Sequence, residues 1–146
     1  MKVSLSWLKK YTDVNVSVQE LCDKMTLAGF EIEECIDLSK TMSNVVVGKV
    51  EKMERHPDSD HLWICQINTG NGIEQIVTGA QNVNEGDLVP AALHDSHLPN
   101  GAHIKRGKLR GVESNGMLCS GEELMLTEAD YPGAEVYGIL ILKPTE

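Results

Sequence analysis

Residues 56–70 read HPDSDHLWICQINTG and combine a polar turn with a short apolar strand. Pro57 favours extended backbone at the residue before it, and the DSD that follows has side chains that bond to nearby backbone N–H groups in turns. The apolar run LWICQI that comes next is typical of a β-strand. This stretch therefore predicts a reversal of the chain between a strand at residues 45–55 and a strand at residues 62–68.

The two histidines and two aspartates of HPDSDHL are also good ligands for a transition metal. A metal site needs three or four ligands that converge, and the spacing here matches no defined motif. A second cluster, His94, Asp95 and His97, is not placed beside the first by anything in the sequence. Ser59 lacks the surroundings of a catalytic serine. We therefore expect a turn here, with no catalytic or metal site.

Outward from this stretch, short apolar runs alternate with turn residues, as in a small β-protein. Asn84–Asp87 and Pro99–Gly101 are strong turn formers. Four to six short strands in about eighty residues predict a small closed or partly open barrel. The expected strands besides the two named above are Ile73–Thr78, Leu88–Leu93, Ala102–Leu109 and Gly116–Cys119.

The first forty residues have a different pattern, which is helical. Ser17 and Glu20 form a capping box, and apolar residues follow from Val18 to Ala28 at spacings of three and four. Such a helix must bury its apolar stripe, yet forty residues are usually too few to form a stable core alone. We therefore expect residues 1–40 to be part of a domain that other residues complete.

The composition argues against a general polyanion binder. The chain of 146 residues has 13 Lys and Arg against 22 Asp and Glu, a net charge of −9. Any nucleic-acid function must therefore rest on a local basic patch. Residues 45–126 hold seven basic side chains, and four of them lie within residues 105–110. This short segment is the candidate patch.

Four scattered cysteines, Cys22, Cys35, Cys65 and Cys119, form no CxxC pair, which argues against a zinc ribbon or a thioredoxin-type motif. We expect reduced thiols in or near the core. The N-terminus has no continuous apolar segment of the kind that signal peptides carry, and no run is long enough to span a bilayer. These features predict a cytoplasmic protein.

Three pieces of the chain occur in a fixed order: HPDSDHLWICQINTG, IVTGAQNVNEGDLVPAAL and LPNGAHIKRGKLRGVESNGMLCSGEEL. Together they resemble the tRNA-binding OB-fold module of several aminoacyl-tRNA synthetases and free-standing tRNA-binding proteins, over about residues 43–126. The preceding pieces SLSWLKKYTD and ELCDKMTLAGFEIEE resemble the N-terminus of the bacterial phenylalanyl-tRNA synthetase β subunit.

The resemblance implies a mainly β fold: a five-stranded OB-fold barrel with short helices, preceded by an incomplete α/β segment. Residues 1–40 would be part of a first domain, and residues 41–146 the tRNA-binding OB-fold domain with the start of a return segment. The implied parent is a ligase that charges tRNA with phenylalanine, using ATP and magnesium, as an α2β2 tetramer. Its aminoacylation and editing sites would lie elsewhere, so we expect no catalysis and no cofactor in this stretch.

The resemblance also favours an RNA-binding role for the candidate patch. Lys105, Arg106, Lys108 and Arg110 lie along an expected strand, which would place charges on both of its faces, so that those on one face could meet phosphate. The same lysines could instead protect a strand edge from pairing. Further candidates are the basic residues Lys49, Lys52 and Arg55 of the first strand, and the polar residues Asn82, Ser114, Asn115 and Ser120 of the matching motifs.

The barrel region contains one tryptophan, Trp63, and we expect it in the core. Single-strand binders usually stack bases on aromatic side chains. Recognition of folded tRNA by shape and phosphate contacts therefore fits better than base reading, and we expect no DNA or membrane partner. Three alternatives remain: a mainly structural OB fold within the tetramer, a free-standing tRNA-binding chaperone, and a metal-dependent hydrolase using HPDSDHL.

Overall fold

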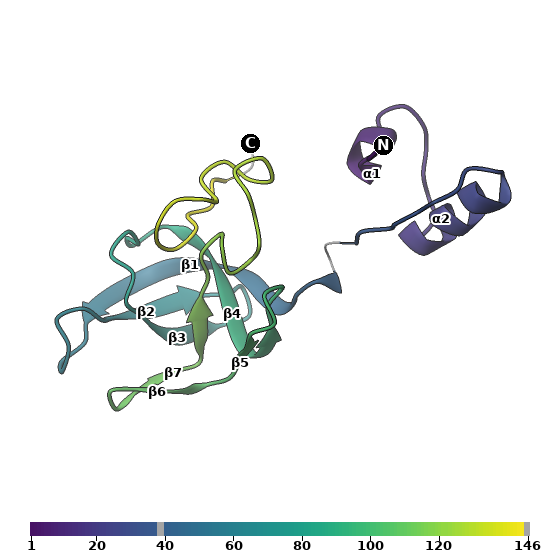
Figure 1. Cartoon of the computed structure of the whole chain (residues 1–146). Coiled ribbons are helices and arrows are strands. Elements are labelled where there is room, and N and C mark those ends of the chain that lie inside the picture. Colours follow the sequence, from purple (N-terminus) through teal and green to yellow (C-terminus); the bar gives the residue numbers. More distant parts are fainter. Residues whose placement is uncertain (38–39, 145–146) are drawn as a thin grey trace. The chain divides into compact units, whose positions relative to one another are not determined.

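The structure is a computed structural model that describes residues 1–37 and 40–144. Contacts divide the chain into two compact units on either side of residues 38–39. We call them the helical unit and the barrel unit. Figure 1 shows both, with the barrel unit containing all the labelled strands.

The helical unit contains α1 (Leu5–Leu8) and α2 (Val18–Leu27). The predicted capping box is present at the start of α2, because the Ser17 hydroxyl accepts a hydrogen bond from the Glu20 N–H at 3.2 Å. No residue of either helix is buried. We expected an α/β segment, but residues 1–37 contain helices and no strand. That this unit is an incomplete domain stays a prediction.

The barrel unit is built on a long first strand, β1 (Ser43–Arg55), which pairs on both sides. Its second half pairs with β2 (Trp63–Asn68), and its first half pairs with β4 (Leu88–His97), both antiparallel. The register shifts between Val50 and Lys52, where a bulge bends β1 so that its two halves pair with different strands. β3 (Ile73–Thr78) continues the sheet beyond β2.

The last barrel strand, β8 (Gly116–Leu118), closes the sheet on itself. β8 pairs with β4, and the residues just before it bond to β3. The Asn115 N–H donates to the Gln75 carbonyl at 2.8 Å, and the Val77 N–H donates to the Ser114 hydroxyl at 3.0 Å. The ring β1–β2–β3–β8–β4 is the five-stranded, partly open topology of an OB fold. The predicted mainly β OB fold is confirmed.

The core lies inside this ring, where inward residues of every barrel strand meet. Val50, Cys65, Ile76, Val89 and Leu118 come from five different strands and belong to one buried cluster. Gly48 of β1 lies so close to β2 that an added Cβ would overlap the Ile67 side chain. Trp63 packs against this cluster, as expected, and is partly buried.

The predicted strand at residues 102–109 is wrong. Residues 102–109 form no continuous strand, but split into β5 (His103–Ile104), which pairs with β4, and β6 (Gly107–Leu109), which pairs with β7 (Val112–Ser114). The chain leaves the barrel at residue 105 because the next part of β4 is already paired with β1 on one side and with β8 on the other. Figure 1 shows β6 and β7 as an arm beside the end of β5.

Candidate nucleic-acid interface

Two connections of the barrel form the candidate interface. In OB folds, the loop between the first and second strands and the loop between the fourth and fifth strands flank the ligand-binding face. Here the first loop is the HPDSDHL turn, and the second contains β5, β6 and β7. We call residues 105–114 of the second loop the hairpin arm.

The hairpin arm turns at Arg110 and Gly111, which both have positive φ, 48° and 84°. Two such residues in succession form the two-residue turn whose twist matches that of a β-hairpin. Glycine adopts this conformation freely, whereas arginine does so at a cost in backbone strain. The position of Arg110 at the tip therefore needs support from elsewhere in the fold.

That support comes from the HPDSDHL turn. His56 is only 3% exposed, and its Nε2 lies 3.0 Å from the Leu109 carbonyl while its Nδ1 accepts the Asp58 N–H at 3.0 Å. These partners assign a neutral imidazole that donates from Nε2. The Arg110 guanidinium also donates to the Asp58 carbonyl at 3.1 Å. The turn and the arm are therefore one braced structure.

The prediction that HPDSDHL is a turn is confirmed, since the His56 N–H bonds to the Leu62 carbonyl at 3.0 Å. The side chains that stabilise it differ from those expected. His56 and Ser59 accept from backbone N–H groups, at Asp58 and His61 respectively. In the described part of the chain, the two aspartate carboxylates make no such hydrogen bond.

The four cations of the candidate patch do not share one strand. Lys105 and Arg106 lie in the link between β5 and β6, Lys108 lies in β6, and Arg110 lies in the turn. The expected arrangement of these charges on the two faces of a single strand is therefore wrong. Among the described residues, Lys105, Lys108 and the guanidinium of Arg106 have no hydrogen-bonded or ionic partner. Three free cations thus follow one another along the hairpin arm.

Two of the three basic residues of β1 interact with other side chains or carbonyls of the barrel unit, and among the described residues the third does not. Lys52 forms an ion pair with Glu54, whose hydrogen bond raises the pKa of the lysine. The guanidinium of Arg55 lies 4.4 Å above the ring of Trp63, and it donates to the Asp60 carbonyl at 2.6 Å. Lys49 is exposed, and no described residue pairs with it.

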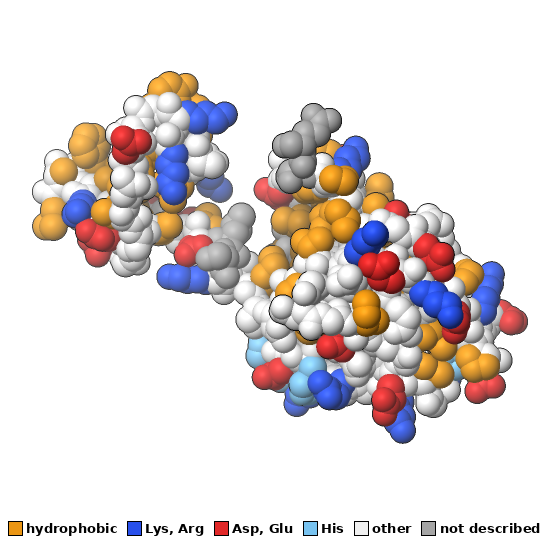
Figure 2. Space-filling view, turned by 180° about the vertical axis from the view of Figure 1, so that it is seen from behind, with side chains coloured by type: hydrophobic (Ala, Val, Ile, Leu, Met, Phe, Trp, Pro, Cys, Tyr) orange, Lys and Arg blue, Asp and Glu red, His pale blue; other side chains and the backbone are white. Residues whose placement is uncertain are grey.

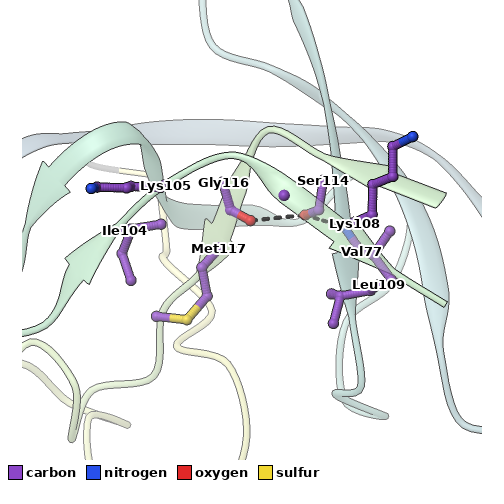
Figure 3. A pocket seen from close by; sticks show the side chains of 9 residues that line it. Val77, Ile104, Lys105, Lys108, Leu109, Ser114, Gly116 and Met117 are labelled. Carbon is purple, nitrogen blue, oxygen red and sulfur yellow. Dashed lines mark hydrogen bonds between the residues drawn. The ribbon is translucent and has the colours of Figure 1, made fainter. Parts of the chain in front are cut away.

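A hollow of about 300 Å³ opens between the hairpin arm and the β3–β8 side of the barrel. Figure 3 shows Ile104, Leu109 and Met117 on its walls, with the amines of Lys105 and Lys108 pointing outward on opposite sides. Inside it, the Ser114 hydroxyl donates to the Gly116 carbonyl at 2.9 Å. The candidate interface is thus an apolar depression with cations at its rim.

The comparisons with known proteins agree with this geometry. Residues 45–137 match the family model described as "Putative tRNA binding domain". The chain belongs to this tRNA-binding-domain family. It is also 51% identical over 134 residues to a phenylalanine–tRNA ligase β subunit of Clostridium tetani, covering 91% of this chain and 17% of that protein.

A phenylalanine–tRNA ligase β subunit of Clostridium acetobutylicum is 49% identical over 143 residues, covering 97% of this chain and 18% of that protein. The chain thus spans less than a fifth of the length of these relatives. Among solved structures, the C-terminal domain of Plasmodium vivax p43 is 28% identical, with a TM-score of 0.47, over 70% of this chain and 53% of that one.

The polar candidates of the tRNA-binding domain fall into two groups. Ser114 is buried, and its hydroxyl already bonds to Val77 and Gly116. Asn82 is bonded twice to the backbone of Ile139, at 2.8 and 3.0 Å, and so attaches the segment that follows the last barrel strand. Ser120 forms a capping box with Glu123. These side chains stabilise the fold, and their role in binding RNA stays a prediction.

Asn115 belongs to the other group. Its backbone helps to close the barrel, while its amide side chain has no hydrogen-bond partner among the described residues and is partly exposed. It is therefore free to meet a ligand.

The histidine cluster of the tRNA-binding domain lies at the base of the arm. His103 bonds to Asp95 at 2.6 Å and stacks on His97, with ring centroids 4.2 Å apart. The hydrogen bond from His103 lowers the pKa of Asp95. His94 accepts the Arg106 N–H at 3.0 Å and so fixes where the arm begins. No group of three or more metal-binding side chains in residues 1–37 and 40–144 could hold a metal ion.

The sequence did not reveal the hollow or the role of His56. Nothing in the sequence marks Ile104, Leu109 and Met117 as neighbours, yet all three line the hollow, and Leu109 is 45% exposed. The signal that could have been used is the Arg110–Gly111 pair between Leu109 and Val112, because a glycine flanked by apolar residues in this way is consistent with a two-residue hairpin turn. No helix in the described part of the chain has the length and apolar character that a membrane span requires.

Proposed function

We propose that this chain binds tRNA as part of a phenylalanine–tRNA ligase β subunit, and that the hairpin arm makes the contact. The observation that carries the proposal is the row of unpaired cations, Lys105, Arg106 and Lys108, on the loop that flanks an OB-fold binding face. Phosphate contacts of this kind supply affinity and position an RNA without reading its sequence. Lys49 and Asn115 are the next candidates.

The parent protein would charge tRNA with phenylalanine, using ATP and magnesium, in the cytoplasm. Its partner would be the α subunit in an α2β2 tetramer. The identity to two ligase β subunits over nearly the whole chain supports this assignment. The chain itself would be an accessory module without catalysis or cofactor, because the aminoacylation and editing sites would lie outside it.

A second candidate function is a mainly structural OB fold, which the net charge of −9 favours. Figure 2 shows acidic and basic side chains interspersed over the visible face of the larger unit, with no continuous basic surface. The negative net charge repels a polyanion at long range unless a local basic patch outweighs it. The two candidates differ in whether the hairpin arm has a measurable affinity for tRNA.

The test is a titration of tRNA at several salt concentrations with a charge-matched pair of variants. One variant carries Lys105→Ala, Arg106→Ala and Lys108→Ala, and its control carries Lys2→Ala, Lys9→Ala and Lys10→Ala in the helical unit. A plot of the logarithm of the association constant against the logarithm of the salt concentration has a negative slope. Loss of three phosphate contacts should make this slope shallower by about three. The control should keep the wild-type slope. Equal loss in both variants would contradict a specific role for the arm.

A further inference from the structure

The hollow beside the hairpin arm has a composition that phosphate binding does not explain. Its walls include the side chains of Val77, Ile104, Leu109 and Met117, which are all apolar. Leu109 of β6 is left 45% exposed there, whereas Val77 of β3, which also lines the hollow, is only 4% exposed. An apolar depression in this position suits a ligand that is itself apolar over a flat surface.

The polar groups of the hollow are already used within the fold. The Ser114 hydroxyl accepts the Val77 N–H at 3.0 Å and donates to the Gly116 carbonyl at 2.9 Å, so it has little capacity left for a ligand. The charged groups that line the hollow are Lys105 and Lys108, which have no partner among the described residues. Figure 3 shows their amines on opposite sides of the depression. A ligand would therefore be apolar in the middle and anionic at both ends.

We propose that the hollow takes the base of one unstacked nucleotide of tRNA, while Lys105 and Lys108 hold the phosphates on either side of it. This inference rests on the proposed function and adds a base-binding site to it. A nucleotide within a single strand has the required form, since a flat base lies between two phosphates. Apolar side chains can sandwich such a base in place of aromatic ones, and the thioether of Met117 makes favourable contacts with aromatic rings.

A peptide side chain is the other occupant that an apolar hollow could take. The two lysines argue for RNA, because an aliphatic side chain carries no anionic groups to pair with them. The free cation of Arg106 between them extends the same row of charge. The proposed site also accounts for RNA binding by a barrel that has one partly buried tryptophan and no exposed aromatic platform on its strands.

Gly107 provides a way to fill the hollow without disturbing the barrel. It lines the hollow, its φ is not in the left-handed region, and a Cβ built on it would meet no atom within 4 Å. Gly107→Leu should therefore occupy the space of the base while leaving every charge in place. The matched control is Asn71→Leu, which adds the same side chain at an exposed turn outside the hollow.

The experiment measures binding of three RNAs to the full chain: unfractionated tRNA, a short single strand and its blunt duplex. Gly107→Leu should weaken binding of tRNA and of the single strand by about fivefold or more, since base stacking of this kind is lost. The duplex should lose less than about twofold, and the salt slope should not change, because no phosphate contact is removed. Asn71→Leu should match the wild type.

A second variant, Leu109→Ser, removes an exposed apolar wall without adding bulk, so the test does not depend on one variant folding. Leu109→Ser should weaken binding of tRNA and of the single strand, and spare binding of the duplex, in the same way as Gly107→Leu. If both variants bind all three RNAs like the wild type while the triple alanine variant of the arm loses affinity, the base site is refuted and tRNA binding by the arm stands. If the wild type binds no tRNA at low salt, the proposed function and the base site both fail.

Discussion

The helical unit and the barrel unit both carry regular apolar patterns, yet only one of them forms a core. Among the described residues, every buried hydrophobic side chain lies in the barrel unit, and none lies in residues 1–37. In the helical unit, Trp7, Leu27 and Phe30 are more than half exposed. A periodic pattern thus specifies a helix or a strand, but burial requires a second surface of the right shape.

The comparison is sharpest for the four cysteines, two in each unit. Cys65 and Cys119 are buried, whereas Cys22 is half-buried and Cys35 is exposed. A thiol reagent should modify the buried pair about a thousandfold more slowly than Cys35, because reaction requires opening of the barrel. Mass spectrometry of labelled peptides over time would measure this. Similar rates for all four thiols would contradict a stable barrel core.

The same two thiols predict how stability depends on pH. Burial raises the pKa of Cys65 to about 11 and that of Cys119 to about 12, from an ordinary value of 9.0. A thiol with a raised pKa stays protonated in the fold but ionises in the unfolded chain, so stability should be full below pH 9.0 and fall as pH rises toward 11. Cys65→Ala with Cys119→Ala should flatten this fall, as measured by urea unfolding at each pH.

Truncation of a core residue should have the next largest effect. Ile67 is fully buried in the barrel, so Ile67→Ala should lower the free energy of unfolding by about 2–5 kcal/mol. Leu21→Ala in α2 removes a half-buried side chain and should cost less than about 1 kcal/mol. Trp63 and Trp7 report on the two units separately in urea unfolding. A comparable cost in both would erase the difference between the units.

A smaller effect is expected at the brace between turn and arm. His56→Ala should cost about 2 kcal/mol, because it removes hydrogen bonds to Asp58 and Leu109 in a buried place. His61→Ala, on the same turn but exposed, should cost less than about 0.5 kcal/mol. Thermal unfolding compares the two. An equal cost would mean that His56 does not hold the arm.

The smallest predicted effect concerns tRNA affinity. Glu113 of β7 lies opposite Lys108 of β6, and the two make no ion pair in the described structure. Glu113→Gln should raise tRNA affinity about twofold, since it removes a repulsive charge beside the phosphate contact that we propose for Lys108. Glu31→Gln changes the charge equally in the helical unit and should leave the affinity unchanged. An equal gain in both would indicate a net-charge effect with no role for the arm.

Local rules predicted several elements because their causes are local. The capping box at Ser17 and Glu20 starts α2, and the turn at HPDSDHL forms where proline and small polar residues favour it. The rules failed at residues 102–109, where an apolar and basic run reads as one strand. Whether such a run continues as a strand depends on a free strand edge to pair with. Only two residues of β5 pair with β4, because β8 occupies the neighbouring part of the same edge.

The sequence by itself determined the helix at residues 18–27, the strand-and-turn series that follows residue 43, and the basic segment at residues 105–110. These depend on backbone preference, periodicity and composition, which act between near neighbours. Only the tertiary structure decided that His56 braces the arm, that Ser114 is buried, and that Leu109 and Met117 face a hollow. Each of these roles depends on residues more than twenty positions away, which the closure of the barrel and side-chain hydrogen bonds between its loops bring together.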